Sequence, residues 1–354
     1  MAEIRTLSGH DDLLDQAGQG PVVTFNVSRH RSDALLLTEA GVAVLPLPEL
    51  GFDAVLDQIM ALREALEAIA RGGSAARRIV AERALSRILG WLWDTAAGPV
   101  LDALGPVSRV WWATGGLLGL LPLHAAGRHG DGRTVLDRVV SSYTSTIAAL
   151  RHARRDLPPV VTGQTLVVAM PTTPGASELA FVPGEVDLLR RELPDVTVLD
   201  TPTGEEVLTR LPSAWMAHFA CHAVSDPDDP SQSRLLLRDH QVSPLTVIRL
   251  GGLRLDQAGL AYLSACETAV AHHPGLLEES INLATAFQLA GFRQVVGTLW
   301  RVDDWAAGRL AGAFYAAIAD GADAATGVRH AVRALRDESA ALPSLWAAHL
   351  HVGA

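Results

Sequence analysis

Two side chains in this sequence could carry out nucleophilic catalysis together. Cys266 ends the apolar stretch "LAYLSAC", and His222 ends the stretch "AWMAHFACH". A thiol attacks an acyl carbon only as the thiolate, and an imidazole, which titrates near neutral pH, can accept the thiol proton. The two residues are far apart in the sequence, so only tertiary folding can bring them together. Such a pair would form a cysteine-dependent acyl-transfer site.

The same residues also have a structural interpretation. A cysteine that ends an apolar strand is usually a small buried hydrophobic residue, and a single histidine is more often structural than catalytic. We expect Cys221 to be a core residue, because it precedes His222 and successive side chains of a strand point to opposite faces. Ser264 is an alternative nucleophile, but a thiol needs less activation than a hydroxyl, which favours Cys266. From the residues alone, both interpretations stay open.

The elements around these residues predict an α/β fold. After Gln164, short apolar stretches typical of strands alternate with helical stretches, and the strands include those that end at His222 and Cys266. Alternation of this kind predicts a mostly parallel sheet with helices on both faces. In such sheets, functional groups gather beyond the carboxyl ends of the strands. If the two strands are neighbours, His222 and Cys266 share one edge of the sheet.

The first part of the chain has a different order of predicted strands and helices. Three β-branched, apolar stretches predict strands, and the second and third should form a hairpin through Glu39, Ala40 and Gly41. Residues 52–104 predict long amphipathic helices interrupted at "RGGS". The Pro-rich stretch Asp156–Gln164 is the best candidate for a linker. We therefore predict two parts, residues 1–157 and 158–354.

Composition and charge exclude several functions. The net charge of −10 is spread without acidic or basic blocks, which argues against nucleic-acid binding. All 29 basic residues are arginines, so neither a P-loop lysine nor a pyridoxal Schiff base can form. His272 and His273, near Cys266 and Glu267, fit no zinc-ligand spacing. We expect no metal and no cofactor.

The sequence also predicts a cytoplasmic protein. Two cysteines cannot form a disulfide framework, and the first residues lack the pattern of a signal peptide. The most apolar stretch, Gly115–Gly127, is too short to span a bilayer and is broken by Pro122. We expect no contact with a membrane.

Several longer motifs resemble a known family, the CHAT domain, which is a caspase-like peptidase domain. They are "HFACHAVSDPDDPSQSRLLLRD", "LSACETA" and "AFQLAGFRQVVGTLWRVDD". Upstream, "RSDALLLTEAGVAVLPLP", "RVWWATGGLLGLLPLHAAG" and "DRVVSSYTST" resemble the part that precedes the peptidase core in this family. The resemblance implies a caspase-like three-layer α/β/α fold with a mostly parallel sheet. It also implies a pseudo-caspase-like leading half, as in the clan of caspases and separases.

The resemblance assigns roles to the candidate residues. It implies that His222 is the base and Cys266 the nucleophile, and that the backbone N–H groups of Ala223 and Cys266 form the oxyanion hole. The family more often has glycine after the histidine. Ala223 retains the N–H, and the donor is preserved if the backbone angle there tolerates a Cβ atom.

The substrate-binding residues are less strongly indicated. Ser264, two positions before the nucleophile, corresponds to a residue that lines the specificity pocket in caspases. Further candidates are Glu267, Arg301, Asp303 and Asp304. Alternatively, Asp303 and Asp304 cap and begin the next helix, and Glu267 begins a turn.

The predicted function is therefore that of a cysteine endopeptidase that cleaves a protein or peptide substrate through a Cys-His dyad. A helical-repeat sensor or another regulator is the expected partner. The main alternative is a non-catalytic caspase-like scaffold in signalling or defence. Acyl transfer to an amine in place of water is a third option, which the sequence does not separate from hydrolysis.

Overall fold

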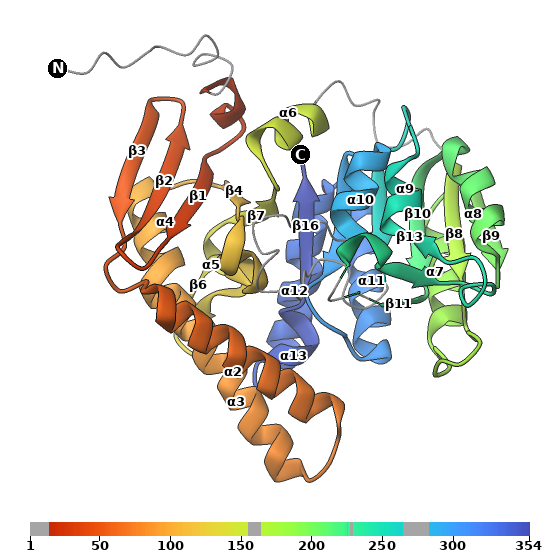
Figure 1. Cartoon of the computed structure of the whole chain (residues 1–354), viewed down its shortest axis with the longest axis horizontal. Coiled ribbons are helices and arrows are strands. Elements are labelled where there is room, and N and C mark those ends of the chain that lie inside the picture. The colour runs from red at the N-terminus through yellow and green to blue at the C-terminus, as the bar shows by residue number, and fades with distance from the viewer. Residues whose placement is uncertain (1–13, 155–163, 225, 227–228, 265–282) are drawn as a thin grey trace.

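The computed structural model describes residues 14–154, 164–224, 226, 229–264 and 283–354. These residues form one 11-stranded sheet with the strand order β3-β2-β1-β4-β7-β16-β15-β14-β10-β8-β9 (Figure 1). Its strands are β1 (Val22–Val27), β2 (Ser32–Thr38), β3 (Gly41–Pro46), β4 (Arg109–Ala113), β7 (Val140–Tyr143), β8 (Gln164–Ala169), β9 (Val196–Asp200), β10 (Ala214–Ala220), β14 (Leu260–Leu263), β15 (Gln294–Thr298) and β16 (His349–Gly353).

Two small sheets accompany the large one. One joins β5 (Gly127–Arg128) to β6 (Arg133–Thr134), and the other joins β11 (His222–Val224), β12 (Arg234–Leu236) and β13 (Leu245–Thr246). The helices are α2 (Phe52–Ala70), α3 (Ala75–Leu92), α4 (Gly98–Leu104), α5 (Val135–Arg138), α6 (Ile147–Ala153), α7 (Val182–Glu192), α8 (Gly204–Arg210), α9 (Val247–Gly251), α10 (Leu283–Ala290), α11 (Asp304–Ala319), α12 (Ala324–Glu338) and α13 (Pro343–Trp346).

The first hairpin and the two long helices of the leading part form as the sequence predicts. β2 and β3 form the expected antiparallel hairpin, with Thr38 opposite Gly41 at the turn. The two long helices, α2 and α3, are separated at "RGGS", where Gly72 and Gly73 have positive φ angles of 68° and 125°. Ser74 then caps α3 by accepting a hydrogen bond from the Arg77 backbone N–H. The α2–α3 hairpin projects away from the sheet (Figure 1).

Most strand pairs of the second part are parallel, as predicted. β10 lies between β8 and β14, and all three run in the same direction. Every residue of β10 is buried, which is expected for a parallel strand covered on both faces. Its neighbouring side chains meet different helices: His218 bonds to Tyr315 of α11, whereas the Phe219 ring packs against Phe287 of α10. The sheet is therefore the middle of three layers.

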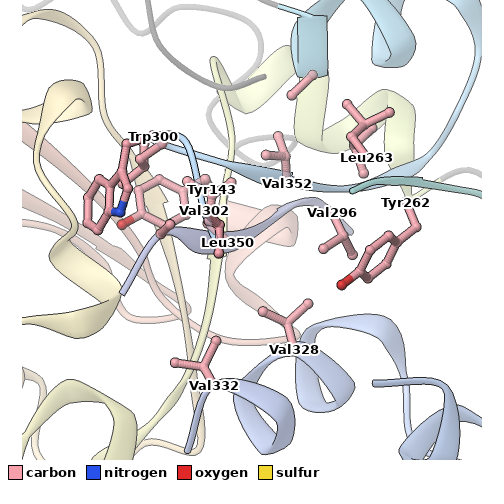
Figure 2. Packing of buried hydrophobic residues seen from close by; sticks show 14 of the residues in the cluster. Tyr143, Tyr262, Leu263, Val296, Trp300, Val302, Val328, Val332, Leu350 and Val352 are labelled. Atoms are coloured by element: carbon pink, nitrogen blue, oxygen red, sulfur yellow. The ribbon is translucent and has the colours of Figure 1, made fainter. Parts of the chain in front are cut away.

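One hydrophobic core runs through both parts of the chain. A single cluster of buried residues extends from Val23 in β1 to Val352 in β16. Figure 2 shows Val328 and Val332 of α12 pointing from the helix toward the sheet, where Val296 and Leu350 lie. The division at residues 157 and 158 falls in a stretch outside the described residues, so it stays a prediction. The sheet and the core are shared by the parts on either side.

The two strands at the junction of these parts, β7 and β16, were not predicted as strands. β16, the C-terminal strand, lies in the middle of the sheet between β15 and β7 (Figure 1). It is antiparallel to β15 and parallel to β7. The Trp111 indole N–H of β4 donates a 2.8 Å hydrogen bond to the Gly353 carbonyl. The last strand of the sequence thus joins the leading strands to the rest of the sheet.

Candidate active site

His222 lies where the large sheet gives way to a small one. β10 ends at Ala220, and His222 begins β11, in which it pairs with Leu236 of β12. The side chain is 8% exposed, and its Nε2 lies 2.8 Å from the Ser177 carbonyl oxygen. A carbonyl can only accept a hydrogen bond, so Nε2 carries a proton. In the neutral ring, Nδ1 is therefore the nitrogen able to accept a proton.

Ala223 has an ordinary strand conformation. It lies opposite Leu235 of β12, and its side chain packs against the hydrophobic core. Among the described residues, the only non-glycine positions with positive φ are Asp195 and Thr201. A Cβ atom at position 223 is thus free of backbone strain.

The strands that lead to the two predicted catalytic residues are neighbours. β10 and β14 are parallel, and His218 lies opposite Tyr262. The chain reaches His222 four residues after His218, and Cys266 four residues after Tyr262. The condition under which His222 and Cys266 would share one edge of the sheet, that their strands are neighbours, is therefore met for β10 and β14. Cys266, Glu267, His272 and His273 lie outside the described residues. The assignment of Cys266 as the nucleophile therefore stays a prediction.

A small cavity of about 20 Å³ lies beside these strand ends. Its lining includes Glu185, Ser264 and Asp304, whose side chains could act there, and also Cys221. Cys221 is 1% exposed, in agreement with its expected place in the core. The Asp304 carboxylate accepts a 3.0 Å hydrogen bond from the Phe181 backbone N–H. Burial, together with the nearby charges of Glu185 and Asp303, raises the pKa of the Asp304 carboxyl above its ordinary value.

The other substrate-binding candidates have different surroundings. Asp303 is the N-cap of α11, and its side chain accepts a 3.0 Å hydrogen bond from the Trp305 N–H. This is the capping role that the sequence offered as the alternative for this residue. Arg301 and Asp303 are exposed, and neither lines the cavity. Of the candidates in described positions, the structure brings together Ser264 and Asp304.

A buried polar network beneath the cavity escaped the sequence analysis. The Glu185 carboxylate of α7 lies 2.9 Å from His218 Nε2 and accepts a 3.3 Å hydrogen bond from the Ser264 hydroxyl. His218 Nδ1 lies 2.9 Å from the Tyr315 hydroxyl, and the His218 ring stacks on Tyr262. His218 is fully buried and Glu185 is 4% exposed. The network therefore joins α7, β10, β14 and α11.

The sequence does carry a weak signal for this network. In α7, Glu185 falls on the apolar stripe formed by Val182, Val186 and Leu189. His218 is the one polar residue within β10. A charged residue on a buried helix stripe needs a partner, and a histidine inside an apolar strand can be one. The pairing itself depends on how α7 packs over β10, which the local pattern does not encode.

Metal-ligand clusters and membrane-spanning helices are both absent from the described residues. Within residues 14–154, 164–224, 226, 229–264 and 283–354, no group of three or more histidine, cysteine, aspartate or glutamate side chains is arranged to hold a metal ion. In the same part of the chain, no helix combines the length and the apolar character needed to cross a lipid bilayer.

Comparison with solved structures identifies the fold. The chain is similar to separase in two crystal structures of the Saccharomyces cerevisiae separase–securin complex, with TM-scores of 0.73 and 0.71 and identities of 11% and 10%. These matches cover 98% of this chain but only 30% and 31% of the separase chain. The Arg-specific cysteine proteinase gingipain R matches with a TM-score of 0.45 and 11% identity, over 77% of this chain and 67% of its own. The two separase matches show that the fold is the caspase-like α/β fold.

Comparison of sequences places the chain in a family. No curated protein sequence matches it. The family model of the CHAT domain matches residues 86–354, which is most of the chain and includes His222, Ser264 and Cys266. The chain therefore belongs to the CHAT-domain family.

Proposed function

We propose that this protein is a cysteine endopeptidase in which Cys266 is the nucleophile and His222 the general base. The observation that carries the proposal is the hydrogen bond from His222 Nε2–H to the Ser177 carbonyl. It fixes the tautomer that has a basic Nδ1, at the end of a strand whose parallel neighbour leads to Cys266. Family membership and the caspase-like fold support the same assignment.

The proposed reaction has two stages. His222 Nδ1 takes the Cys266 thiol proton, and the thiolate attacks the carbonyl carbon of the scissile peptide bond. The backbone N–H groups of Ala223 and Cys266 stabilise the negative charge on the carbonyl oxygen. His222 then gives its proton to the leaving amine, and a thioester remains on Cys266. Water, deprotonated by His222, hydrolyses the thioester and releases the acid product.

Substrate contacts in this proposal come from residues beside the strand ends. Ser264 and Asp304, which line the small cavity there, are the primary candidates. Glu267, Arg301 and Asp303 are secondary candidates. We also propose that a second protein regulates the enzyme in the cytoplasm, where a reactive thiol stays reduced. In support, the similar separase was crystallised in complex with securin, although the present chain spans less than a third of that separase.

The test is covalent labelling with a peptide that carries a thiol-reactive electrophile. We expect the unmodified chain to be labelled at Cys266, and Cys266→Ala to abolish labelling. His222→Ala should slow labelling about 100-fold or more, the usual contribution of a general base. Cys221→Ala is the matched control, because Cys221 is buried and should leave labelling intact. Labelling that persists in both Cys266→Ala and His222→Ala would contradict the proposal and favour the non-catalytic scaffold.

A further inference from the structure

We propose that Glu185 is a positioning residue for this active site, which fixes Ser264 and the adjacent ends of β10 and β14. The inference rests on the proposed function, since it concerns how His222 and Cys266 are held. Glu185 bonds to His218 and Ser264, which precede the proposed catalytic residues His222 and Cys266 in the chain. Its effect passes through the residues that precede them in the chain.

The first step of the argument is where the carboxylate lies. Glu185 is 4% exposed, so its charge is largely removed from water. One oxygen lies 2.9 Å from His218 Nε2, and the other accepts the Ser264 hydroxyl at 3.3 Å. A Cβ atom placed on Gly308 of α11 would lie 3.8 Å from the carboxylate, so α11 packs closely over it. Burial on this scale holds the carboxylate in one place.

The second step is what the carboxylate holds. Because an ionised carboxylate only accepts hydrogen bonds, His218 Nε2 carries the proton and His218 Nδ1 accepts from the Tyr315 hydroxyl in the neutral ring. The His218 ring stacks on Tyr262 at a centroid distance of 5.0 Å. This contact joins β10 to β14 on the face toward α7. One carboxylate thus fixes the relative placement of both strands.

The third step is how close this lies to the catalytic residues. Ser264 follows β14 directly, and its backbone N–H donates a 3.0 Å hydrogen bond to the Phe219 carbonyl of β10. Two residues later the chain reaches Cys266, and three residues after Phe219 it reaches His222. Ser264 is therefore held at its side chain by Glu185 and at its backbone by β10. Loss of the first contact frees the Ser264 side chain, two positions before the proposed nucleophile.

The test uses the rate of inactivation by the peptide electrophile, separated into its maximal rate and its half-saturating concentration. We expect Glu185→Ala and Ser264→Ala each to lower the maximal rate about 10-fold. The half-saturating concentration should change little in Glu185→Ala and rise in Ser264→Ala, because the Ser264 side chain is also a candidate substrate contact. Since both substitutions break the same contact, the maximal rate of the double variant should be only about 10-fold to 30-fold below that of the unmodified chain. Glu185→Gln should stay within about threefold of the unmodified chain, because a glutamine can bond to Ser264 and to the other tautomer of His218.

Glu82 provides the matched control. It is 2% exposed in α3, and its carboxylate accepts hydrogen bonds from the Ser344 hydroxyl and backbone N–H of α13. Glu82→Ala should lower stability as Glu185→Ala does, yet leave the maximal inactivation rate unchanged. An unchanged rate in Glu185→Ala, or a product of the two single effects in the double variant, would overturn the inference. So would a Ser264→Ala effect confined to the half-saturating concentration.

A second readout does not depend on catalysis. Amide hydrogen exchange at Ser264 should be about 10-fold faster in Glu185→Ala than in Glu82→Ala, each compared with the unmodified chain. Equal exchange in the two variants would reject the positioning role. An unmodified chain that shows no His222-dependent labelling would count against the proposed function alone, and the exchange measurement would still decide the role of Glu185.

Discussion

The backbone conformation at position 223 determines whether an alanine is tolerated there in place of glycine. The family more often has glycine after the histidine, and glycine is needed where φ is positive. Here the residue belongs to β11 and is not among the non-glycine residues with positive φ. Ala223 therefore keeps the N–H that the proposed oxyanion hole requires, and its methyl group adds a contact with the core. The departure from the family pattern does not by itself indicate an inactive enzyme.

Replacement of Ala223 by glycine should accordingly bring no gain. We expect Ala223→Gly to lower the free energy of unfolding by about 0.5–1 kcal/mol, because glycine loses more backbone entropy in a strand. Urea unfolding measures this change. Labelling by the peptide electrophile should stay within about threefold of the unmodified chain. A labelling rate about 10-fold faster in Ala223→Gly would show that the alanine strains the site after all.

At the level of elements, most strands and helices are predictable from the sequence. The exception that matters most is β16, the strand that joins the two parts of the sheet. The stretch "HLHVG" of β16 alternates histidine with Leu350 and Val352, a pattern typical of a strand with one polar face. In the structure both faces are buried: His349 is 2% exposed and His351 is 1% exposed. Buried histidines escape a pattern based on apolar residues. The parallel α/β repeat was predictable because its strands are continuous apolar runs.

The candidate site also has features that the sequence predicts and features that it does not. The sequence predicts that His222 and Cys266 end two parallel strands, and the structure shows that these strands, β10 and β14, are neighbours. The acceptor for His222 was not predictable, because a backbone carbonyl such as that of Ser177 carries no residue-type signal. Glu185 was not predicted either, since its partners come from strands and helices distant in the sequence.

Removal of β16 should unfold the chain. A chain that ends at Ala348 loses the strand between β15 and β7, along with the buried side chains of Leu350 and Val352. Each of these apolar side chains contributes about 1.5–3 kcal/mol, and the cut also leaves the Trp111 N–H without its acceptor. The total is comparable with the marginal stability of a typical domain, about 5–15 kcal/mol. We expect no cooperative thermal unfolding, as measured by circular dichroism.

The matched control for that truncation is a chain that ends at Gly353. It retains all of β16 and the acceptor for Trp111, so its unfolding temperature should equal that of the full chain. A cooperative transition near the original temperature in the chain that ends at Ala348 would show that β16 is dispensable.

The whole molecule depends on a junction that is rich in buried histidines. His351 Nδ1 of β16 lies 2.9 Å from the Ser142 hydroxyl of β7, and His124 Nδ1 lies 2.9 Å from the Tyr143 hydroxyl. Burial lowers the pKa of His124 to about 3, of His349 to about 4 and of His351 to about 3. Beside this burial effect, the charge of Asp323 raises the pKa of His351 and that of Arg109 lowers it, while His349 lowers the pKa of His124. The two parts of the sheet therefore meet around three neutral imidazoles.

This junction should make the protein sensitive to mild acid. In the unfolded chain these histidines titrate at 6.5, so below that pH the unfolded state binds protons that the folded state does not. Their contribution to stability is thus complete above pH 6.5 and decreases as the pH falls toward the folded values. At pH 5 the contribution of each histidine to the free energy of unfolding is about 2 kcal/mol smaller than at neutral pH, or about 6 kcal/mol smaller for the three together. Urea unfolding at pH 7 and pH 5 should reveal a loss of this order.

The substitution His349→Leu removes one of the three histidines and so tests about one third of the expected loss of stability in acid. Neither ring nitrogen of His349 has a hydrogen-bond partner among the described residues, so a leucine of similar size removes a buried polar group without breaking a contact. We expect the variant to be at least as stable as the original chain at pH 7. Between pH 7 and pH 5 it should lose about 2 kcal/mol less, because one titrating group is gone. An unchanged pH dependence in His349→Leu would show that protonation of this junction does not govern unfolding in acid.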